Sequence, residues 1–436
     1  MDVKPGYKQT EVGVIPEDWK VKQIKDMKPY VTSGSRGWAS YYSDQGSPFI
    51  RITNLNRASI YMDLEDLRFV NLPANNSEAM RTQLQDGDIL ISITADIGIV
   101  GNVSSKLPKP AYINQHIALV RFDPAQTSSR FVSYFLASEK PQRLFRALTD
   151  SGAKAGMNLT TVQQIRVNLP PTKAEQEAIA GALSDADALI ESLEQLIVKK
   201  RQIKQGAMQE LLTGKKRLPG FEVKSGYKQT EAGLIPEDWE LDSLEHLSAF
   251  ITKGSTPTTY GFKWETHGVL FLRSECVSDN GLDLNQSMYI SPEAHSVLRR
   301  SQVCDGDILI TITGNVGRVV FLYGIGTANL NQHIARVRMN ATHVNAHYVY
   351  HFLSQRSVRR RFASITTGQA YPQISLKQVR DAKVPRPPTK TEQTAIASIL
   401  SDMDAEISTL EEKLAKARQI KQGMMQELLT GRIRLV

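Results

Sequence analysis

The side chains best placed to do chemistry are two pairs of aspartates that stand at corresponding places in the sequence. Asp86 and Asp88 flank one glycine, and Asp305 and Asp307 flank another. Paired carboxylates can hold a metal ion, but an Asp-Gly-Asp segment directly before an apolar run is typical of a turn that leads into a buried strand. We therefore predict a structural role for these aspartates and no metal site.

The histidines and cysteines give no catalytic or metal-binding arrangement either. His116 and His333 lie in the repeated segment NQHIA without partners at ligand spacing, so we expect them to form hydrogen bonds within the scaffold. Cys276 and Cys304 are the only cysteines, which excludes a disulfide framework and a Cys-rich zinc site. We expect both to be ordinary buried thiols.

Two motifs that an autonomous enzyme acting on DNA would need are absent from the 436 residues. There is no GxxxxGK[ST] phosphate-binding loop, and no Asn or Asp followed by Pro-Pro-Tyr or Pro-Pro-Phe, which amino-methyltransferases use to hold a flipped base. The formal charge of +8 and the pI near 9.2 favour a polyanionic partner. The most apolar stretch, residues 89–101, is too short to span a membrane, and the N-terminus lacks a signal-peptide core, so we expect a cytosolic protein.

The elements that carry these residues occur twice. GYKQTEVGVIPEDW at residues 6–19 returns as GYKQTEAGLIPEDW at 226–239, and residues 170–218 match residues 387–435 at 33 of 49 positions. The chain is therefore one unit written twice.

One internal block departs from this repetition. Residues 20–85 and 240–304 scarcely match, although the segments on either side do. Two copies that agree in their frame and differ in one block indicate a shared scaffold that carries two different recognition surfaces.

Two long helices are predicted, at residues 172–214 and 389–436. Their apolar residues step by alternating fours and threes, which predicts a coiled-coil seam, and each helix, with roughly 41 helical residues, would be about 60 Å long at 1.5 Å per residue. Because the first helix leads to the second globular unit and the second helix starts from it, we expect an antiparallel pair that brings the C-terminus near residue 6. The predicted capping boxes are Thr172 with Glu175 and Thr389 with Glu392, and the predicted stops are Gly214 and Gly431.

The predicted fold class is α+β, with two pseudo-twofold-related recognition domains separated by the antiparallel helix pair. The segments DILISIT, DILITIT and 165–169 predict strands, whereas 128–148, with a break at Pro141, and 345–362 predict helices. The predicted boundaries are 1–171 for the first domain, 172–214 for the first helix, 215–225 for a linker, 226–388 for the second domain and 389–436 for the second helix.

The duplicated frame resembles the specificity subunit of type I restriction-modification enzymes over essentially the whole chain. The motifs that carry the resemblance are the GYKQTE openings, the DGDILI strands, the NQHIA segments and the PPTKxEQxxIAxxLSDxD helices that end in QELLTG. The resemblance implies two target recognition domains, each recognising one half of an asymmetric, gapped site in double-stranded DNA. It also implies a prokaryotic subunit without catalysis of its own. Such a subunit recruits two modification subunits, which use S-adenosylmethionine to methylate adenine, and two restriction subunits, which use ATP and Mg.

If the two halves recognise different sequences, residues that differ between corresponding loops should contact bases, and shared residues should contact phosphates or partners. The loops 31–44 and 251–264 align in register, and 151–158 and 366–373 form a second pair. The alternative is that these side chains only cover surface loops. The candidates are Arg36, Trp38, Tyr41, Tyr42, Lys154 and Asn158 in the first half, Lys253, Thr256, Thr258, Tyr260, Lys263, Gln369, Tyr371 and Gln373 in the second, and the shared Arg51 and Arg273 for phosphates.

Equivalent helix residues are candidates for contacts with the modification subunits, because two identical partners need two equivalent surfaces. The sequence does not separate this role from packing within the coiled coil. The rival interpretation of the whole chain is a non-catalytic scaffold, an orphan or decoy subunit that binds modification subunits without recognising DNA. The helix candidates are Gln176, Gln393, Arg201, Lys204, Arg418 and Lys421.

Overall fold

A computed structural model describes residues 4–73, 76–150, 157–222, 226–279, 281–368 and 371–435. The chain forms two compact units, one made of Met1–Glu194 with Glu412–Val436 and one made of Gln195–Glu411. Each unit mixes strands with helices, so the predicted α+β class is confirmed. Each also takes part of both long helices, because the division between the units falls within those helices.

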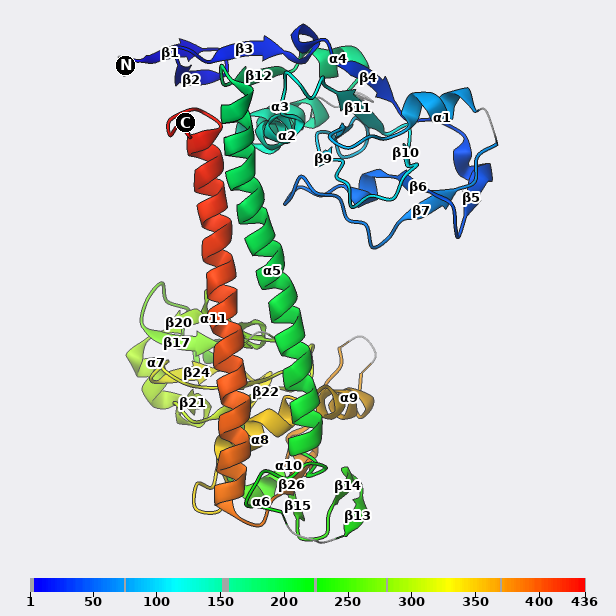
Figure 1. The fold of residues 1–436 in the computed structure, drawn as a ribbon. Helices are drawn as coiled ribbons and strands as arrows, with labels where there is room; N and C mark the ends of the chain where they lie inside the picture. The colour runs from blue at the N-terminus through cyan, green and yellow to red at the C-terminus, as the bar shows by residue number, and fades with distance from the viewer. Residues whose placement is uncertain are drawn as a thin grey trace. The chain divides into compact units, whose positions relative to one another are not determined.

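The first unit is built on an antiparallel sheet whose strand order is β4-β11-β8-β9. Every residue of β8, ILIS, is buried, and Gly87 before it has φ +86°, a conformation in which glycine avoids the strain that other residues meet. The predicted Asp-Gly turn and buried strand are therefore confirmed. Helices α2 and α3 lie beside this sheet in Figure 1. The bounds are β4 Tyr30–Ser33, β8 Ile89–Ser92, β9 Val100–Asn102, β11 Ile117–Arg121, α2 Ser129–Ala137 and α3 Glu139–Asp150.

A second sheet in this unit has the order β10-β6-β7-β5, with β6 and β10 parallel. An N-terminal hairpin, β1-β2, and a separate antiparallel pair, β3-β12, complete the strands. Strand β12 lies at the place predicted for residues 165–169. The bounds are β1 Tyr7–Thr10, β2 Gly13–Pro16, β3 Lys20–Gln23, β5 Tyr42–Ser43, β6 Ser47–Ile50, β7 Arg68–Val70, β10 Tyr112–Ile113, β12 Arg166–Leu169, α1 Ser77–Thr82 and α4 Leu159–Gln164.

The second unit repeats this topology, except at the edges of its second sheet and in an additional hairpin, β18-β19. Its main sheet has the order β16-β25-β22-β23, and its second sheet, β20-β17-β24-β21, again contains one parallel pair, β17 with β24. The bounds are β13 Tyr227–Thr230, β14 Gly233–Pro236, β15 Glu240–Ser243, β16 Ser248–Lys253, β17 Val269–Leu272, β18 Val277–Ser278, β19 Gly281–Leu282, β20 Met288–Ile290, β21 Gln302–Val303, β22 Ile308–Thr311, β23 Val319–Phe321, β24 Ala328–Leu330, β25 Ile334–Met339, β26 Lys383–Arg386, α6 Leu244–Leu247, α7 Pro292–Val297, α8 Ala346–Leu353, α9 Arg356–Ser364 and α10 Leu376–Arg380.

The long helices are α5, Lys173–Leu211, and α11, Lys390–Leu428. The hydroxyls of Thr172 and Thr389 each accept a hydrogen bond, at 3.2 Å, from the backbone N–H three residues later, so both predicted N-caps are confirmed. The predicted reach of Glu175 and Glu392 back to the cap is wrong, because arginine side chains bind both carboxylates. Gly214 and Gly431 follow the helix ends with φ near +70°, as C-terminal glycines do.

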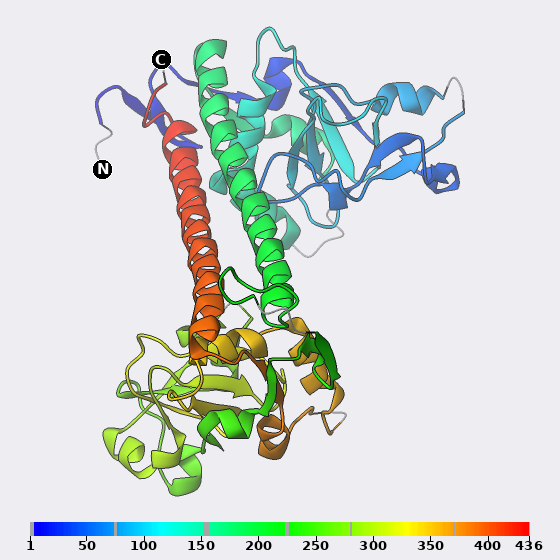
Figure 2. The same cartoon turned by 60° about the horizontal axis from the view of Figure 1, so that its bottom comes forward.

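The two long helices run antiparallel within each unit. In the first unit, Asp187 of α5 pairs with Lys421 of α11, and the later Glu194 pairs with the earlier Arg418. The C-terminus meets the N-terminal hairpin there, since Tyr7 Oη donates to Gly431 O at 3.2 Å. Figure 2 shows the end of α11 beside this hairpin. The predicted approach of the C-terminus to residue 6 is confirmed.

Two helical predictions need correction. The break in residues 128–148 is at Ser138, and Pro141 stands in the first turn of α3, where its missing N–H breaks no intrahelical bond. Residues 345–362 form two helices, α8 and α9, instead of one. Among the described residues, no helix is long and apolar enough to cross a membrane.

Candidate functional site

The shared Gly-Ser of the two aligned loops forms the stem from which each loop leaves the main sheet. A Cβ added at Gly34 would lie 2.0 Å from Asn114 O, and one at Gly254 would lie 1.9 Å from Leu330 O. The serines that follow donate from their backbone N–H groups to Ile113 O and Leu330 O, at 3.3 Å and 3.2 Å. Only glycine permits this approach, so the repeated Gly-Ser is explained by the stem.

The repeated NQH segment lies directly beside this stem. His116 Nδ1 lies 2.6 Å from Thr94 Oγ1, and Asn114 Oδ1 accepts from the backbone N–H of His116. In the second unit, Asn331 Oδ1 accepts from the backbone N–H of His333 in the same way, and His333 Nε2 lies 3.0 Å from Gln332 Nε2. The predicted scaffold role of the two histidines is confirmed.

Asp88 and Asp307 hold the main sheets together. Both are fully buried, and each binds one arginine of the neighbouring strand through both carboxylate oxygens, Arg121 in the first unit and Arg338 in the second. Burial raises the pKa of Asp88, and its hydrogen bonds with Arg121 and with the Gln85 backbone oppose this rise. The described residues contain no group of three His, Cys, Asp or Glu that could hold a metal ion. Because both aspartates are buried and bound by an arginine of the neighbouring strand, their predicted structural role is confirmed.

The cysteines are only partly as predicted. Cys276 is fully buried, but Cys304 is half-buried and lies 2.7 Å from Arg338 Nη2. The Cys304 thiol thus contacts the arginine that binds Asp307, and it is not buried in the hydrophobic core.

In the first loop, Trp38 does not face solvent. Its side chain is 4% exposed, packs against Phe49 and Tyr112, and donates from Nε1 to Glu78 Oε2 at 3.0 Å. The prediction that the Trp38 ring contacts bases is therefore wrong, because the ring is buried and packs the loop against the second sheet. Arg36 and Tyr42 are exposed, and Tyr41 is half-buried.

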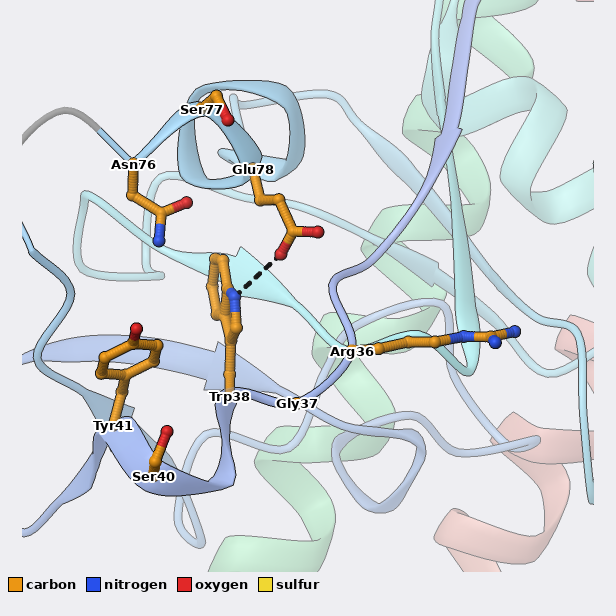
Figure 3. A pocket seen from close by; sticks show the side chains of 8 residues that line it. All are labelled: Arg36, Gly37, Trp38, Ser40, Tyr41, Asn76, Ser77 and Glu78. Carbon is orange, nitrogen blue, oxygen red and sulfur yellow. Dashed lines mark hydrogen bonds between the residues drawn. The ribbon is translucent and has the colours of Figure 1, made fainter.

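A shallow depression of about 460 Å³ lies between this loop and α1. Figure 3 shows Trp38 and Glu78 pointing toward each other across it, whereas Arg36 extends away from it. The sequence prediction missed the contribution of α1, although an Asn-Ser-Glu start is a helix N-terminal signal. Its lining residues are Arg36, Gly37, Trp38, Ser40, Tyr41, Asn76, Ser77 and Glu78.

The second loop presents a different surface on the same stem. Lys253, Thr258, Tyr260 and Lys263 are exposed, as base-contacting candidates must be. Thr256 is half-buried and donates to Gln332 Oε1 at 2.6 Å, so it supports the loop.

The second pair of loops is only partly described, since Lys154 and Gln369 lie outside the described residues. Asn158 caps α4, with Oδ1 accepting from Thr161 N at 2.8 Å. Tyr371 and Gln373 are exposed.

The shared arginines that were predicted to contact phosphates are engaged locally. Arg51 pairs with Asp66 at 3.2 Å, and Arg273 Nε donates to Gln286 O at 3.0 Å. Each side chain thus binds a later segment of its own unit, 15 residues after Arg51 and 13 residues after Arg273.

Among the helix residues predicted to contact partners, the glutamines are not available. Gln176 Oε1 accepts from Ser128 N, and Gln393 Oε1 accepts from Asn345 N, each at 2.9 Å, and both side chains are buried. They stabilise the starts of α2 and α8, so the prediction that they contact partners is wrong. Arg201 and Arg418 are exposed, paired with Glu411 and Glu194.

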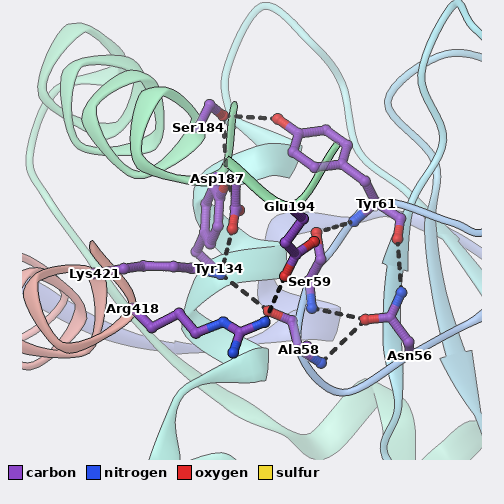
Figure 4. Close-up of polar contacts among 10 residues, drawn as sticks. All are labelled: Asn56, Ala58, Ser59, Tyr61, Tyr134, Ser184, Asp187, Glu194, Arg418 and Lys421. Carbon is purple, nitrogen blue, oxygen red and sulfur yellow. Dashed lines mark hydrogen bonds and ion pairs between the residues drawn. The ribbon is translucent and has the colours of Figure 1, made fainter. Parts of the chain in front are cut away.

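Lys421 is also internal. It lies 2.5 Å from Asp187 Oδ1 and donates to Ala58 O, while Tyr134 Oη donates to the other oxygen of Asp187 at 2.6 Å. Figure 4 shows this network joining both helices to α2 and to the loop at residues 56–61. Lys204 of the second unit pairs with Asp404 in the equivalent way and is half-buried.

A family model described as the type I restriction modification DNA specificity domain matches residues 16–200 and 236–419. A putative type I restriction enzyme MjaX specificity subunit of Methanocaldococcus jannaschii is 29% identical, over 98% of this chain and 97% of the relative. The type I restriction enzyme EcoBI specificity subunit of Escherichia coli is 24% identical, over 96% and 87%. A crystal structure of the S subunit of a type I restriction-modification system from M. genitalium superposes with a TM-score of 0.60 at 15% identity, covering 98% of each chain, which shows a shared fold.

Proposed function

The chain belongs to the type I restriction-modification DNA specificity family, and from this we propose that each of its two units recognises one half of an asymmetric, gapped DNA site. DNA sequence recognition is the function of such a subunit. The proposal of two different half-sites rests on one observation: the two units have the same loop stem but different loop side chains. Gly34-Ser35 and Gly254-Ser255 make the same backbone contacts, whereas the exposed side chains beyond them differ.

The exposed side chains of the first unit suit one set of base contacts. Arg36 suits the O6 and N7 acceptors of guanine, and the carboxylate of Glu78, at the edge of the depression, suits the N4 amino donor of cytosine. Trp38 orients that carboxylate through its indole N–H. Tyr41 and Tyr42 add contacts to base edges or phosphates.

The second unit offers a different set at the corresponding place. Lys253 and Lys263 suit guanine or phosphate, while Thr258 and Tyr260 suit base edges and thymine methyl groups. A half-site of different sequence follows from this difference.

The chain would act without catalysis of its own, as the platform of a larger complex. Two modification subunits would bring S-adenosylmethionine, and two restriction subunits would bring ATP and Mg. The exposed Arg201 and Arg418, on α5 and α11, are equivalent positions that suit two identical modification subunits.

Single-molecule methylome sequencing tests the proposal, comparing a host that has this chain and its modification subunit with a host that lacks only this chain. A split, asymmetric adenine-methylated motif that depends on the chain is expected. Replacing residues 20–169 with those of a relative should then change one half of the motif alone. If modification subunits bind the chain and no motif appears, the chain is a scaffold that does not recognise DNA.

A further inference from the structure

In both units, an arginine binds the end of the strand that leads into the Gly-Ser stem of the recognition loop, although the arginine comes from the block in which the two halves scarcely match. Arg81 Nη1 donates to Thr32 Oγ1 and, at 2.6 Å, to Ser33 O. In the second unit, Arg300 Nε donates to Thr252 Oγ1 at 2.9 Å. Each arginine thus lies where the last residues of β4 or β16 lead into the loop.

The surroundings of the two arginines also correspond. Thr32 Oγ1 donates to Ser33 O, and Thr252 Oγ1 donates to Lys253 O, both at 3.4 Å, so each threonine hydroxyl is free to accept from its arginine. In the first unit, Tyr30 Oη further donates to Arg81 O at 3.0 Å, which fixes the backbone of the arginine against the same strand.

Neither guanidinium has a counter-charge within the described part of the chain. Both residues are exposed, and no Asp or Glu carboxylate among the described residues lies within 4 Å of them, whereas Arg51 and Arg121 nearby are both ion-paired. Among the described residues, the Arg81 side chain donates through Nη1 alone, and the Arg300 side chain donates through Nε alone. A guanidinium carries five N–H donors, so each arginine is held at one edge and keeps donors for an anion.

We propose that Arg81 and Arg300 are equivalent DNA-phosphate contacts, one beside each recognition loop, that set the position of the loop on the duplex. The proposal rests on the function proposed above and names residues that hold the backbone rather than the bases. A phosphate contact carries no sequence information, which accounts for an identical residue in two units whose other exposed loop residues differ. If the arginines only anchored the strand end, a neutral hydrogen-bond donor would suffice, because their acceptors are hydroxyl and carbonyl oxygens.

Substitution by glutamine separates charge from anchoring, because its amide can still donate to the threonine while the positive charge is lost. The variants are Arg81→Gln, Arg300→Gln and the double variant, each assembled with the modification subunits. Their affinity for a duplex carrying the methylated motif is measured by fluorescence anisotropy between 50 and 200 mM salt. Each single variant should reduce the slope of log affinity against log salt concentration by about 0.9, and the double variant by about 1.8.

The controls distinguish a phosphate contact from other roles. Arg130→Gln removes another exposed charge, on α2, and should leave the slope unchanged, and Arg81→Lys should also leave it unchanged. The methylated motif should be the same in every variant. An unchanged slope in the double variant would overturn the proposal, and so would a changed motif, since that indicates base contact or a displaced loop. If the unsubstituted complex shows no preference for its motif, the proposed function itself fails.

Discussion

Arg434 Nη2 lies 2.8 Å from Oε2 of Glu175, so the last residues of the chain are bound to the first turn of α5 within the first unit. The second unit repeats this pair, with Arg217 Nη2 2.9 Å from Glu392 Oε2 in the first turn of α11. Each arginine also binds an aspartate of the repeated PEDW segment, Asp18 or Asp238. The residues after each long helix therefore bind the start of the other helix in both units.

Replacing Arg217 with alanine should destabilise the second unit by about 3 kcal/mol, because the carboxylate of Glu392 is 1% exposed and would lose its cation. Burial raises the pKa of Glu392, and the hydrogen bond and charge of Arg217 oppose that rise. Arg434→Ala likewise leaves a buried carboxylate, Glu175, without its cation, but it should cost less because Arg434 is 30% exposed whereas Arg217 is 10% exposed. Urea unfolding checks both variants. Arg432→Ala, which removes an exposed pair with Glu427, is the matched control, and an equal loss there would contradict the buried-pair argument.

A circular permutant opened between Pro219 and Gly220, with the original ends joined, should fold and bind DNA like the original chain. Both residues are exposed, and the opening spares Arg217 and the hydrogen bond from Tyr227 Oη to Lys215 O, which corresponds to the bond from Tyr7 Oη to Arg432 O. Thermal unfolding should stay within about 4 °C. Opening the chain inside the buried strand β8 should abolish folding. If neither permutant folds, the two termini cannot be joined without disrupting the fold, which would contradict their placement side by side.

Much of the frame follows from sequence because repetition and local signals agree. The N-caps at Thr172 and Thr389, the Asp-Gly turns before β8 and β22, and the antiparallel helix pair are each fixed by residues near one another in the chain or by connectivity. Such local consistency is what sequence patterns detect best.

The candidate site was harder to predict because its side chains depend on contacts between distant segments. Trp38 is a residue type that could contact bases, yet Phe49, Glu78 and Tyr112 enclose it. Its hydrogen-bond partner Glu78 lies 40 residues later in the chain, and no local sequence pattern reveals such a contact. The repeated sequence predicts a partner contact for Gln176, and this prediction fails for the same reason. Its amide binds Ser128, and repetition alone does not separate internal contacts from external ones.

The second unit should lose stability in acid through His351. This side chain is 1% exposed, Nδ1 has no hydrogen-bond partner among the described residues, and Nε2 lies 3.0 Å from Ser401 Oγ. Burial, followed by the charges of Lys204 and His347, lowers its pKa to about 3. Asp404 Oδ2 lies 3.8 Å from Nδ1 but is paired with Lys204, so it does not offset the burial.

The sign follows from proton uptake. Because the pKa of His351 is lower in the folded state, the unfolded state binds more protons, and stability falls as pH drops from about 6.5 toward 3. At pH 5 the loss is about 2 kcal/mol. His351→Tyr should reduce it, since Tyr134 at the corresponding place in the first unit donates to Asp187 and stays neutral there. Melting temperatures between pH 7.5 and 5 check this, with the exposed His343→Tyr as control. An unchanged pH dependence in His351→Tyr would assign the acid loss to other groups.

Substitutions in the two recognition loops should act on separate half-sites. Arg36 and Tyr260 are exposed in loops that leave equivalent stems, and neither side chain takes part in the hydrogen bonds that fix those stems. Arg36→Ala should weaken binding by roughly 10- to 100-fold, corresponding to about 1–3 kcal/mol for a lost base contact, only on duplexes that retain the half-site assigned to residues 20–169. Tyr260→Ala should weaken binding only through the other half. Anisotropy titrations on four duplexes, with both, either or neither half-site intact, separate these effects. Because a phosphate contact weakens binding to all four duplexes alike, uniform losses would assign both residues to the DNA backbone.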